Sequence, residues 1–402
     1  MTGNTFFSLE KLPGGRSGGA TQAETRVYNE RLIVSLVRRH EQLSKAELTR
    51  LTGLAPQTIT TLVNRAASDG LLTRRAPLRG RLGQPSVPYA LNPDAAFAFG
   101  LKVDHRSADV ALVNFVGDVL GFERLEMDHP HPEAVMEFAR AAITRIRRKH
   151  RSIPTARIAG LGIASPVHQW QWADDPPAAS GPLAAWREID IRAELDQAFE
   201  WPVFLFNDAV VSASAELMFH RDIGRADFLY AYIGYHIGGA LVLDHHLFPG
   251  RNKLAGALGE TPMPGTDAKG EPTLTQEISL RALAAKSGGD ASRIWTQNES
   301  WDGIPGVAAW IDRVADGLAY AARSAVALLD IDNLVIDGAI PPAIRKEIAR
   351  GTRRRLGRAF VNRPEPLSVI EGTFGHLGPV IGGASIPLLV KYSNDKELLF
   401  KE

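Results

Sequence analysis

The chain has 402 residues with ordinary apolar and charged content, enough for two or three domains with stable cores. It has no cysteine, which excludes disulfides and thiolate zinc sites, and we expect neither a metal nor a cofactor. Residues 1–22 are predicted to be a flexible segment without a signal-peptide core, and no stretch is long enough to span a membrane. We therefore expect a cytoplasmic protein.

The net charge of +1 is unevenly distributed along the chain. Residues 1–90 contain thirteen Lys or Arg and six Asp or Glu, a net charge of +7, which leaves −6 for the remainder. A basic N-terminal part on a mildly acidic body is typical of a nucleic-acid-binding domain joined to a sensing domain. The alternative is a chance asymmetry of charge.

A helix over residues 27–39 is followed by the start of a helix-turn-helix pattern. Residues 44–47 read Ser-Lys-Ala-Glu, a capping box that begins a second helix. Leu48 and Leu51 are expected to point inward, and Gly53 stands where a helix end favours glycine. Two short helices joined by such a turn are the signature of DNA-binding helix-turn-helix domains.

The third helix is the predicted recognition helix. Pro56 suits its first turn, and the polar residues Gln57, Thr58 and Thr61 lie off the apolar face. Gln pairs with adenine edges and a Thr methyl packs on thymine, so we expect these three to contact bases. Asn64 and Arg65 are expected to meet the DNA backbone. The predicted buried face consists of Ile59, Leu62, Val63 and Ala66.

Residues 71–91 read as strand, loop and strand, which is the pattern of a wing. Arg74, Arg75, Arg79 and Arg81 are placed to meet phosphates or a narrow minor groove. A winged helix-turn-helix is therefore predicted over residues 23–92. The alternatives are a three-helix bundle with solvated polar faces and a basic surface hairpin. The predicted DNA contacts are Ser44, Lys45, Pro56, Gln57, Thr58, Thr61, Asn64, Arg65, Arg74, Arg75, Arg79, Arg81 and Gln84.

Residues 93–402 read as an α/β body in which one pattern occurs twice. Such a duplication indicates two similar lobes with a cleft between them. Long helices are expected over 132–148 and 311–329. The expected strands are 97–103, 109–116, 119–125, 158–163 and 203–206 in the first unit, and 228–233, 238–243, 246–248 and 334–338 in the second.

The chain resembles the ROK family (repressors, open reading frames and kinases) over nearly its whole length. In the N-terminal part, residues 44–48, 52–54 and 80–85 look like the family's repressor branch, although Ala55 replaces the usual capping Ser. In the body, 160–166, Asn207-Asp208-Ala209 and 234–240 are similar to its sugar and phosphate loops. The resemblance implies a two-lobed actin-like fold of the sugar-kinase and ribonuclease H-like type.

The first phosphate loop departs from the family pattern. Active members carry Asp-x-Gly-Gly-Thr, whose small residues let the backbone hold ATP phosphates. Here Lys102 replaces the acid that helps to hold magnesium, and His105 and Arg106 replace the glycines. In kinase members the Asp matched by Asp208 is the general base. Without a nucleotide site we expect it to bind a ligand hydroxyl and not to catalyse.

The family's zinc and sugar ligands are also altered. Glu260 matches a zinc-binding His, Ala257 matches a sugar-binding Glu, and residues 271–277 contain no Cys. The resemblance therefore implies no zinc. Glu277 matches the last sugar-binding acid. The predicted effector-binding residues are Ser165, Asn207, Asp208, Glu260 and Glu277.

The sequence thus predicts a transcriptional regulator of carbohydrate genes, a repressor by resemblance. Its partners are expected to be palindromic double-stranded DNA and a sugar-like effector, bound by a homodimer or homotetramer. One alternative is an ATP-dependent sugar kinase with an added DNA-binding domain. The other is a regulator whose body binds no ligand.

Overall fold

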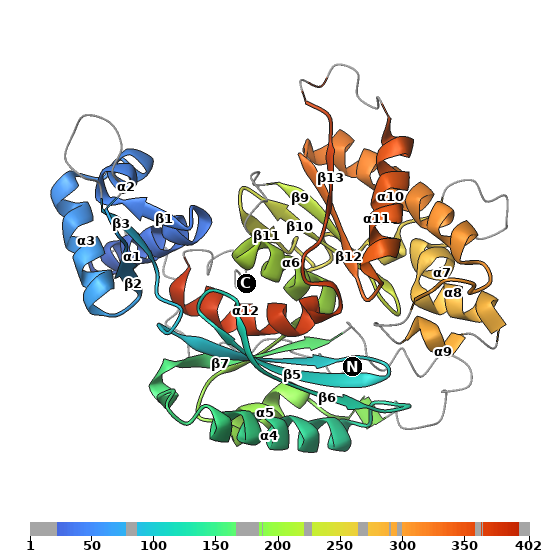
Figure 1. Ribbon diagram of the computed structural model, residues 1–402, viewed down its shortest axis with the longest axis horizontal. Helices are drawn as coiled ribbons and strands as arrows, with labels where there is room; N and C mark the ends of the chain where they lie inside the picture. Colours follow the sequence, from blue (N-terminus) through green and yellow to red (C-terminus); the bar gives the residue numbers. More distant parts are fainter. Residues whose placement is uncertain are drawn as a thin grey trace.

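The computed structural model describes residues 22–77, 87–165, 185–186, 188–220, 227–263, 272–288, 291–295, 300–357, 363 and 365–393. The described strands form one three-stranded sheet, ordered β1-β3-β2, and two five-stranded sheets. The small sheet belongs to an N-terminal domain, and each large sheet forms one lobe of the body (Figure 1). The expected flexible segment 1–22 lies outside the described residues except for Gln22, which begins the first helix.

The N-terminal domain consists of α1 (Gln22–Arg39), β1 (Gln42–Ser44), α2 (Lys45–Thr52), α3 (Pro56–Ser68), β2 (Leu72–Arg74) and β3 (Pro88–Leu91). The predicted capping box is present, because Ser44 Oγ accepts from Glu47 N and the Glu47 carboxylate accepts from Ser44 N. Gly53 ends α2 with φ 69°, as a left-handed cap requires. The expectation for Leu51 was wrong: it is 48% exposed, because α2 presents only Leu48 fully to the core.

The first lobe contains β4 (Phe97–Val103), β5 (Ser107–Asn114), β6 (Val119–Glu126), α4 (Pro132–Lys149), η1 (Thr155–Arg157), β7 (Ile158–Ser165), α5 (Ile191–Ala198), β8 (Val203–Asn207) and α6 (Asp208–Phe219). Its sheet order is β6-β5-β4-β7-β8. The first three strands are an antiparallel meander, and β7 and β8 continue the sheet in parallel.

The second lobe repeats this arrangement. Its sheet order is β11-β10-β9-β12-β13, again a meander continued by two parallel strands. The predicted duplication is therefore confirmed. The elements are β9 (Phe228–Ile233), β10 (Ile237–Leu243), β11 (His246–Phe248), η4 (Leu258–Glu260), α7 (Leu274–Ile278), α8 (Leu280–Ser287), α9 (Ala291–Ile294), α10 (Val307–Leu329), β12 (Asn333–Gly338), α11 (Pro342–Leu356), β13 (Ser368–Glu371), η6 (Gly375–Leu377) and α12 (Gly378–Tyr392).

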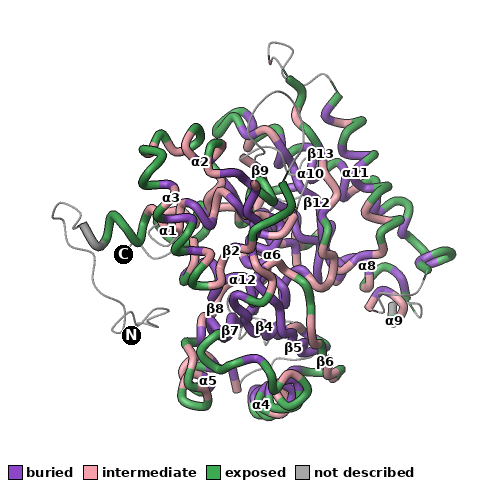
Figure 2. The backbone as a smooth tube through the Cα atoms, turned by 60° about the vertical axis from the view of Figure 1, so that its left-hand side comes forward, coloured by how far each residue is buried: buried purple, intermediate pink, exposed green. Residues whose placement is uncertain are grey.

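Two helices lie between the sheets of the two lobes. α6 packs on β9 and β10, and α12 packs on β4, β5 and β7, while the two helices pack on each other (Figure 1). Figure 2 shows that α12 and the central strands of the first sheet are buried almost throughout, whereas α4 has an exposed outer surface. The C-terminal helix thus returns to cover the first lobe.

Glycines allow α12 to approach its neighbours backbone to backbone. A Cβ atom added to Gly162 of β7 would lie 1.9 Å from the carbonyl oxygen of Gly383 in α12. One added to Gly382 would lie 1.9 Å from the carbonyl oxygen of Val211 in α6. Such distances are impossible for real atoms, so a side chain at either position must separate two packed elements.

We expect Gly382→Ala to lower the free energy of unfolding by about 1–3 kcal/mol, because the methyl group forces α12 away from α6. Urea unfolding of both proteins measures the loss. Gly303→Ala measures backbone strain alone, since a Cβ there meets nothing within 4 Å and only the positive φ is costly. A loss below about 0.5 kcal/mol in Gly382→Ala would show that the contact between α12 and α6 is loose.

Candidate DNA interface and inter-lobe site

The helix α3, which the sequence predicts to be the recognition helix, has two distinct faces. Its buried residues are Ile59, Leu62, Val63 and Ala66, the face expected from the sequence. Gln57, Thr58 and Thr61 are exposed. Ala55 makes no side-chain cap, and Pro56 occupies the first turn. The helix therefore presents a short polar row on the surface of a helix-turn-helix.

The remaining predicted contacts of α2 and α3 also interact within the domain. Lys45 Nζ donates a hydrogen bond of 2.8 Å to Asn64 Oδ1, which joins α2 to α3. Arg65 pairs with Glu30 of α1 at 3.2 Å and, more weakly, with Asp69. Ser44 is 5% exposed and serves as the cap of α2. These contacts fix the position of α3 on the domain.

The wing is described only at its base. Arg74 and Arg75 are exposed at the end of β2, beside the antiparallel strand β3. Arg79, Arg81 and Gln84 lie outside the described residues. The described part of the wing therefore offers two arginines on the same domain as the polar row of α3.

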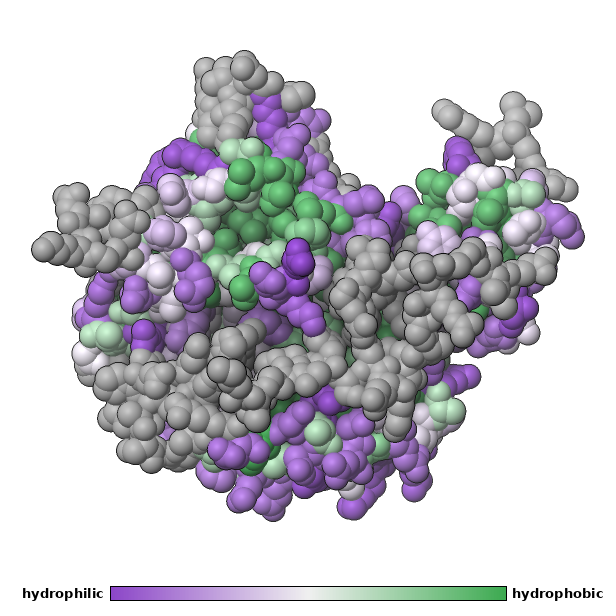
Figure 3. Space-filling view, turned by 180° about the vertical axis from the view of Figure 1, so that it is seen from behind, coloured by the Kyte–Doolittle hydropathy of each residue, from purple (hydrophilic) through white to green (hydrophobic). Residues whose placement is uncertain are grey.

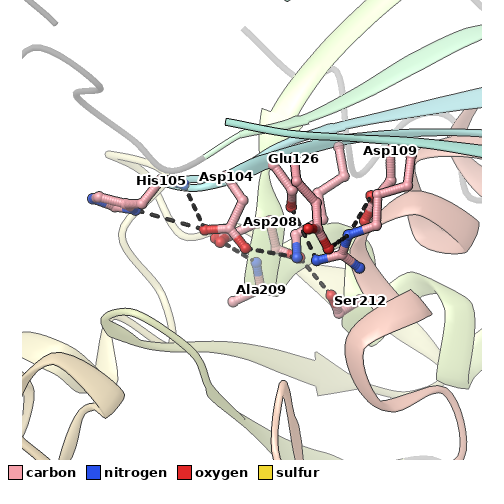
Figure 4. Close-up of polar contacts among 10 residues, drawn as sticks. Asp104, His105, Asp109, Glu126, Asp208, Ala209 and Ser212 are labelled. Atoms are coloured by element: carbon pink, nitrogen blue, oxygen red, sulfur yellow. Dashed lines mark hydrogen bonds and ion pairs between the residues drawn. The ribbon is translucent and has the colours of Figure 1, made fainter. Parts of the chain in front are cut away.

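A buried ion pair occupies the position of the altered phosphate loop. Lys102, at the end of β4, is 2% exposed and its Nζ lies 2.7 Å from Asp104 Oδ2 (Figure 4). Burial opposes the charge of Lys102, but the negative charges of Asp104 and Asp109 outweigh it and raise the lysine pKa. Burial likewise opposes the charge of Asp104, yet Lys102 keeps the pKa of this carboxyl low.

Asp109 and Arg124 extend this ion pair along the sheet. Asp109 of β5 is fully buried and lies 3.6 Å from Arg124 Nε of β6. Burial raises the pKa of Asp109, although Lys102 and Arg124 oppose the increase. This pair could not be predicted from the sequence, since both residues lie within ordinary strands.

Asn207 and Asp208 begin α6 next to the ion pair. Asn207 Oδ1 caps the helix by accepting from Ala209 N at 3.0 Å, and Asp208 Oδ1 accepts from the same nitrogen at 2.8 Å. Burial, with the negative charge of Asp104, raises the pKa of Asp208 to about 6. We name Lys102, Asp104, Asp208 and Tyr232 the inter-lobe cluster, because charges interact among all four.

We expect this raised pKa to make ionised Asp208 unfavourable for folding. The folded pKa of about 6 lies above the ordinary value of 3.8, so the folded state binds more protons and loses stability as the pH rises through this window. The stability of Asp208→Asn relative to the wild type should therefore increase by about 1–2 kcal/mol from pH 4 to pH 7. Urea unfolding of both proteins at pH 4 and at pH 7 measures this increase. A stability difference that is the same at both pH values would contradict the prediction. The comparison cancels the opposite effect of His236, whose pKa burial lowers to about 4.

Where the sequence predicts a cleft, the described side chains of the two lobes are in contact. His105 of the first lobe stacks on Tyr235 of the second, with ring centroids 3.5 Å apart, and Tyr235 stacks on Trp295 at 5.5 Å. His105 is 8% exposed, and burial lowers its pKa. This stack buries His105, which lies in the segment that the resemblance matches to the family's first phosphate loop.

A second ion pair lies at the end of β12. Asp337 is fully buried, 2.9 Å from Arg345 of α11, and accepts from Gly375 N and from the Tyr230 hydroxyl. A Cβ atom on Gly372 would lie 2.4 Å from the Asp337 side chain. The Asp337 side chain therefore fills the space beside the turn between β12 and α11, and both of its carboxylate oxygens accept hydrogen bonds.

The other predicted effector residues are dispersed. Ser165 ends β7 and is 4% exposed, and its hydroxyl has no hydrogen-bond partner among the described residues. Glu260 is exposed in η4, and Glu277 pairs with Arg313 at 3.6 Å. The described contacts connect neither glutamate to Asp208. Glu216, further along α6, is fully buried and pairs with His220 at 2.9 Å.

The described residues contain no group of three or more His, Cys, Asp or Glu side chains arranged to hold a metal ion. Within the same ranges, no helix has both the length and the hydropathy needed to cross a membrane.

The doubled sheet topology, with two helices between the lobes, defines an actin-like fold of the sugar-kinase type that carries an N-terminal winged helix-turn-helix. The ROK family model matches residues 99–388, and the chain belongs to that family.

Known relatives include both uncharacterised and named proteins. The chain is 26% identical over 327 residues to the uncharacterised protein y4fQ of Sinorhizobium fredii, covering 80% of each chain. It is 23% identical to the xylose repressor of Bacillus spizizenii, over 60% of this chain and 62% of the repressor's length. A solved ROK family transcriptional regulator, described as a homologue of the Escherichia coli Mlc protein, superposes with a TM-score of 0.62 at 19% identity. That comparison covers 92% of this chain and 98% of the other, and it concerns the fold.

Proposed function

We propose that the protein is a DNA-binding transcriptional regulator, a repressor of carbohydrate-metabolism genes. The observation that carries this proposal is the exposed polar row Gln57, Thr58 and Thr61 on the second helix of a helix-turn-helix. Residues of this kind, in this position, read base edges in the major groove. The repressors among its relatives support the same function. Binding to genomic DNA places the protein in the cytoplasm.

The body is proposed to sense a sugar-like effector at the inter-lobe cluster. Asn207 and Asp208 present amide and carboxylate groups at the start of α6, near the end of β4. The two acids and one lysine of the cluster favour a neutral polyhydroxylated ligand over a phosphate. Because His105 covers this place by stacking on Tyr235, the ligand enters only when the lobes separate.

Catalysis of phosphoryl transfer is the weaker alternative. Such catalysis depends on bound magnesium and on a backbone that holds the phosphates. The Lys102–Asp104 ion pair and the buried His105 ring lie in the segment that matches the first phosphate loop. We therefore propose a body that binds without catalysing.

Self-association is proposed to place two recognition helices on one palindrome. A hollow of about 200 Å³ in the second lobe has an apolar lining that includes Leu229, Leu241, Leu258 and Leu329. Figure 3 shows apolar side chains gathered around a hollow on the face opposite to that of Figure 1. Leu328, next to the lining residue Leu329 near the end of α10, is 81% exposed. Light scattering would show whether the protein is a dimer or a tetramer.

A thermal-shift series tests the sensing function. We expect one sugar to raise the melting temperature, since a ligand at ~100 times its dissociation constant adds about 2.7 kcal/mol. Mg-ATP, added alone to the same protein, is expected to leave the melting temperature unchanged. A shift with Mg-ATP would favour the kinase, and a flat response to all sugars would favour a regulator whose body binds no ligand.

A further inference from the structure

The end of α1 nearest the body carries a half-buried arginine. The Arg38 guanidinium lies 4.6 Å from the ring centroid of Phe115 and 5.9 Å from that of Phe219. Its Nη1 donates to the carbonyl oxygen of Phe115 at 2.7 Å. Burial lowers the pKa of Arg38 to about 10, so it stays charged at neutral pH. We call Arg38, Phe115 and Phe219 the arginine clamp.

The clamp joins the DNA-binding domain to several segments of the body. Phe115 follows β5 and also packs against Tyr392 of α12, with ring centroids 5.0 Å apart. Ser35 of α1 lies within hydrogen-bond distance of Ser393, at 3.3 Å. Next to the clamp, burial lowers the pKa of His245, in the turn between β10 and β11, and the charge of Arg39 lowers it further. The end of α1 therefore lies near both lobes.

The aromatic partner Phe219 is the last residue of α6. The first residue of this helix is Asp208, a member of the inter-lobe cluster. A helix of twelve residues is about 18 Å long and moves as a rigid rod. At its far end the turn around Gly117 lies directly on Phe219, since a Cβ on Gly117 would be 2.6 Å from the ring. A displacement of Asp208 therefore reaches the clamp without a flexible link.

We propose that Arg38 is a positioning residue that couples separation of the lobes to the orientation of the DNA-binding domain through α6. This inference rests on the proposed function and adds the route by which the inter-lobe cluster controls it. Two aromatic rings and one carbonyl oxygen fix the direction of the guanidinium, so the clamp can orient α1 on the body.

The absence of cysteine from the chain makes a clean test possible. In the full chain, His105→Cys and Tyr235→Cys place one thiol on each side of the lobe contact, and a short bis-maleimide links them. Hydrogen exchange of residues 22–39 is compared before and after linkage. We expect linkage to slow exchange in α1, and we expect no such effect when Arg38→Leu is also present. Arg26→Leu is the control, because Arg26 lies on the same helix with a 55% exposed side chain.

A second variant distinguishes loss of the clamp from a general loss of structure. Phe219→Leu keeps an apolar side chain but removes the ring, and it should weaken the response of α1 as Arg38→Leu does. The proposal is overturned if linkage slows hydrogen exchange in α1 equally with and without Arg38. It is also overturned if linkage leaves exchange in α1 unchanged in the chain that carries only the two introduced cysteines.

Measurements of DNA affinity distinguish failure of this inference from failure of the proposed function on which it rests. With DNA selected in vitro by the full chain, linkage should change affinity about fivefold or more, and only when Arg38 is present. If exchange responds through Arg38 but the chain selects no DNA, the coupling stands and the proposed function fails. If DNA binds with an affinity that linkage changes equally in both backgrounds, the function stands and the coupling fails.

Discussion

Gln57→Glu is expected to lower DNA affinity by about 100-fold, on DNA selected by the unaltered chain. Gln57 is exposed in the first turn of α3, which in this motif meets base edges. The substitution replaces an amide donor with a carboxylate of similar size. It removes the paired hydrogen bonds to adenine and adds repulsion from nearby phosphates.

Fluorescence anisotropy at fixed salt measures this loss, because salt alone changes such affinities by orders of magnitude. Gln197→Glu is the matched control: it makes the same change at an exposed position on α5 of the body. The control should bind as the unaltered protein does, and both variants should keep its melting temperature. An equal loss in both would attribute the effect to net charge and would remove α3 as the reading helix.

The strands were predictable where burial leaves a continuous apolar run. The strands 97–103, 228–233 and 246–248 were placed to the residue, because their limits coincide with turn residues. β5 was expected two residues late, at Asp109, since the buried polar residues Ser107 and Asp109 hide its start. β1 was missed altogether. A strand of three residues is too short to show an alternating apolar pattern, and this one exists only through its pairing with β3.

The faces of the recognition helix were also predictable, because they follow from helical spacing alone. The inter-lobe site was not. The sequence identified Lys102 and His105 as departures from the family, but not their partners. His105 meets Tyr235, 130 positions further along the chain, only after the two lobes have folded and packed together. The arginine clamp depends likewise on three segments that are distant in sequence.

Glu216 shows the same limit for a charged residue. Its spacing on α6 allows a surface position, yet it is fully buried beside His220, with Thr373 N donating to its carboxylate. Burial of α6 on both sides, by α12 and by the second sheet, leaves no solvated face for a charge. A helix between two lobes cannot be recognised from periodicity, because both of its faces are covered.

Lys102→Met should destabilise the fold by about 3–5 kcal/mol, the range found when one partner of a buried ion pair is removed. The methionine fills a similar volume, so the loss comes from charge and not from a cavity. Lys102 faces Asp104 at 2.7 Å and also offsets the charge of the fully buried Asp109. Without the ammonium group these carboxyls must protonate or draw in water, and their pKa values should rise.

Urea unfolding at pH 7 measures the loss, and Lys102→Met combined with Asp104→Asn gives the control. If the loss is electrostatic, the double variant should recover a large part of it, because no unpaired carboxylate remains at position 104. A double variant no more stable than Lys102→Met would mean that the lysine stem, and not its charge, holds the end of β4. Recovery would show that the ammonium charge of Lys102 stabilises the end of β4 by neutralising Asp104.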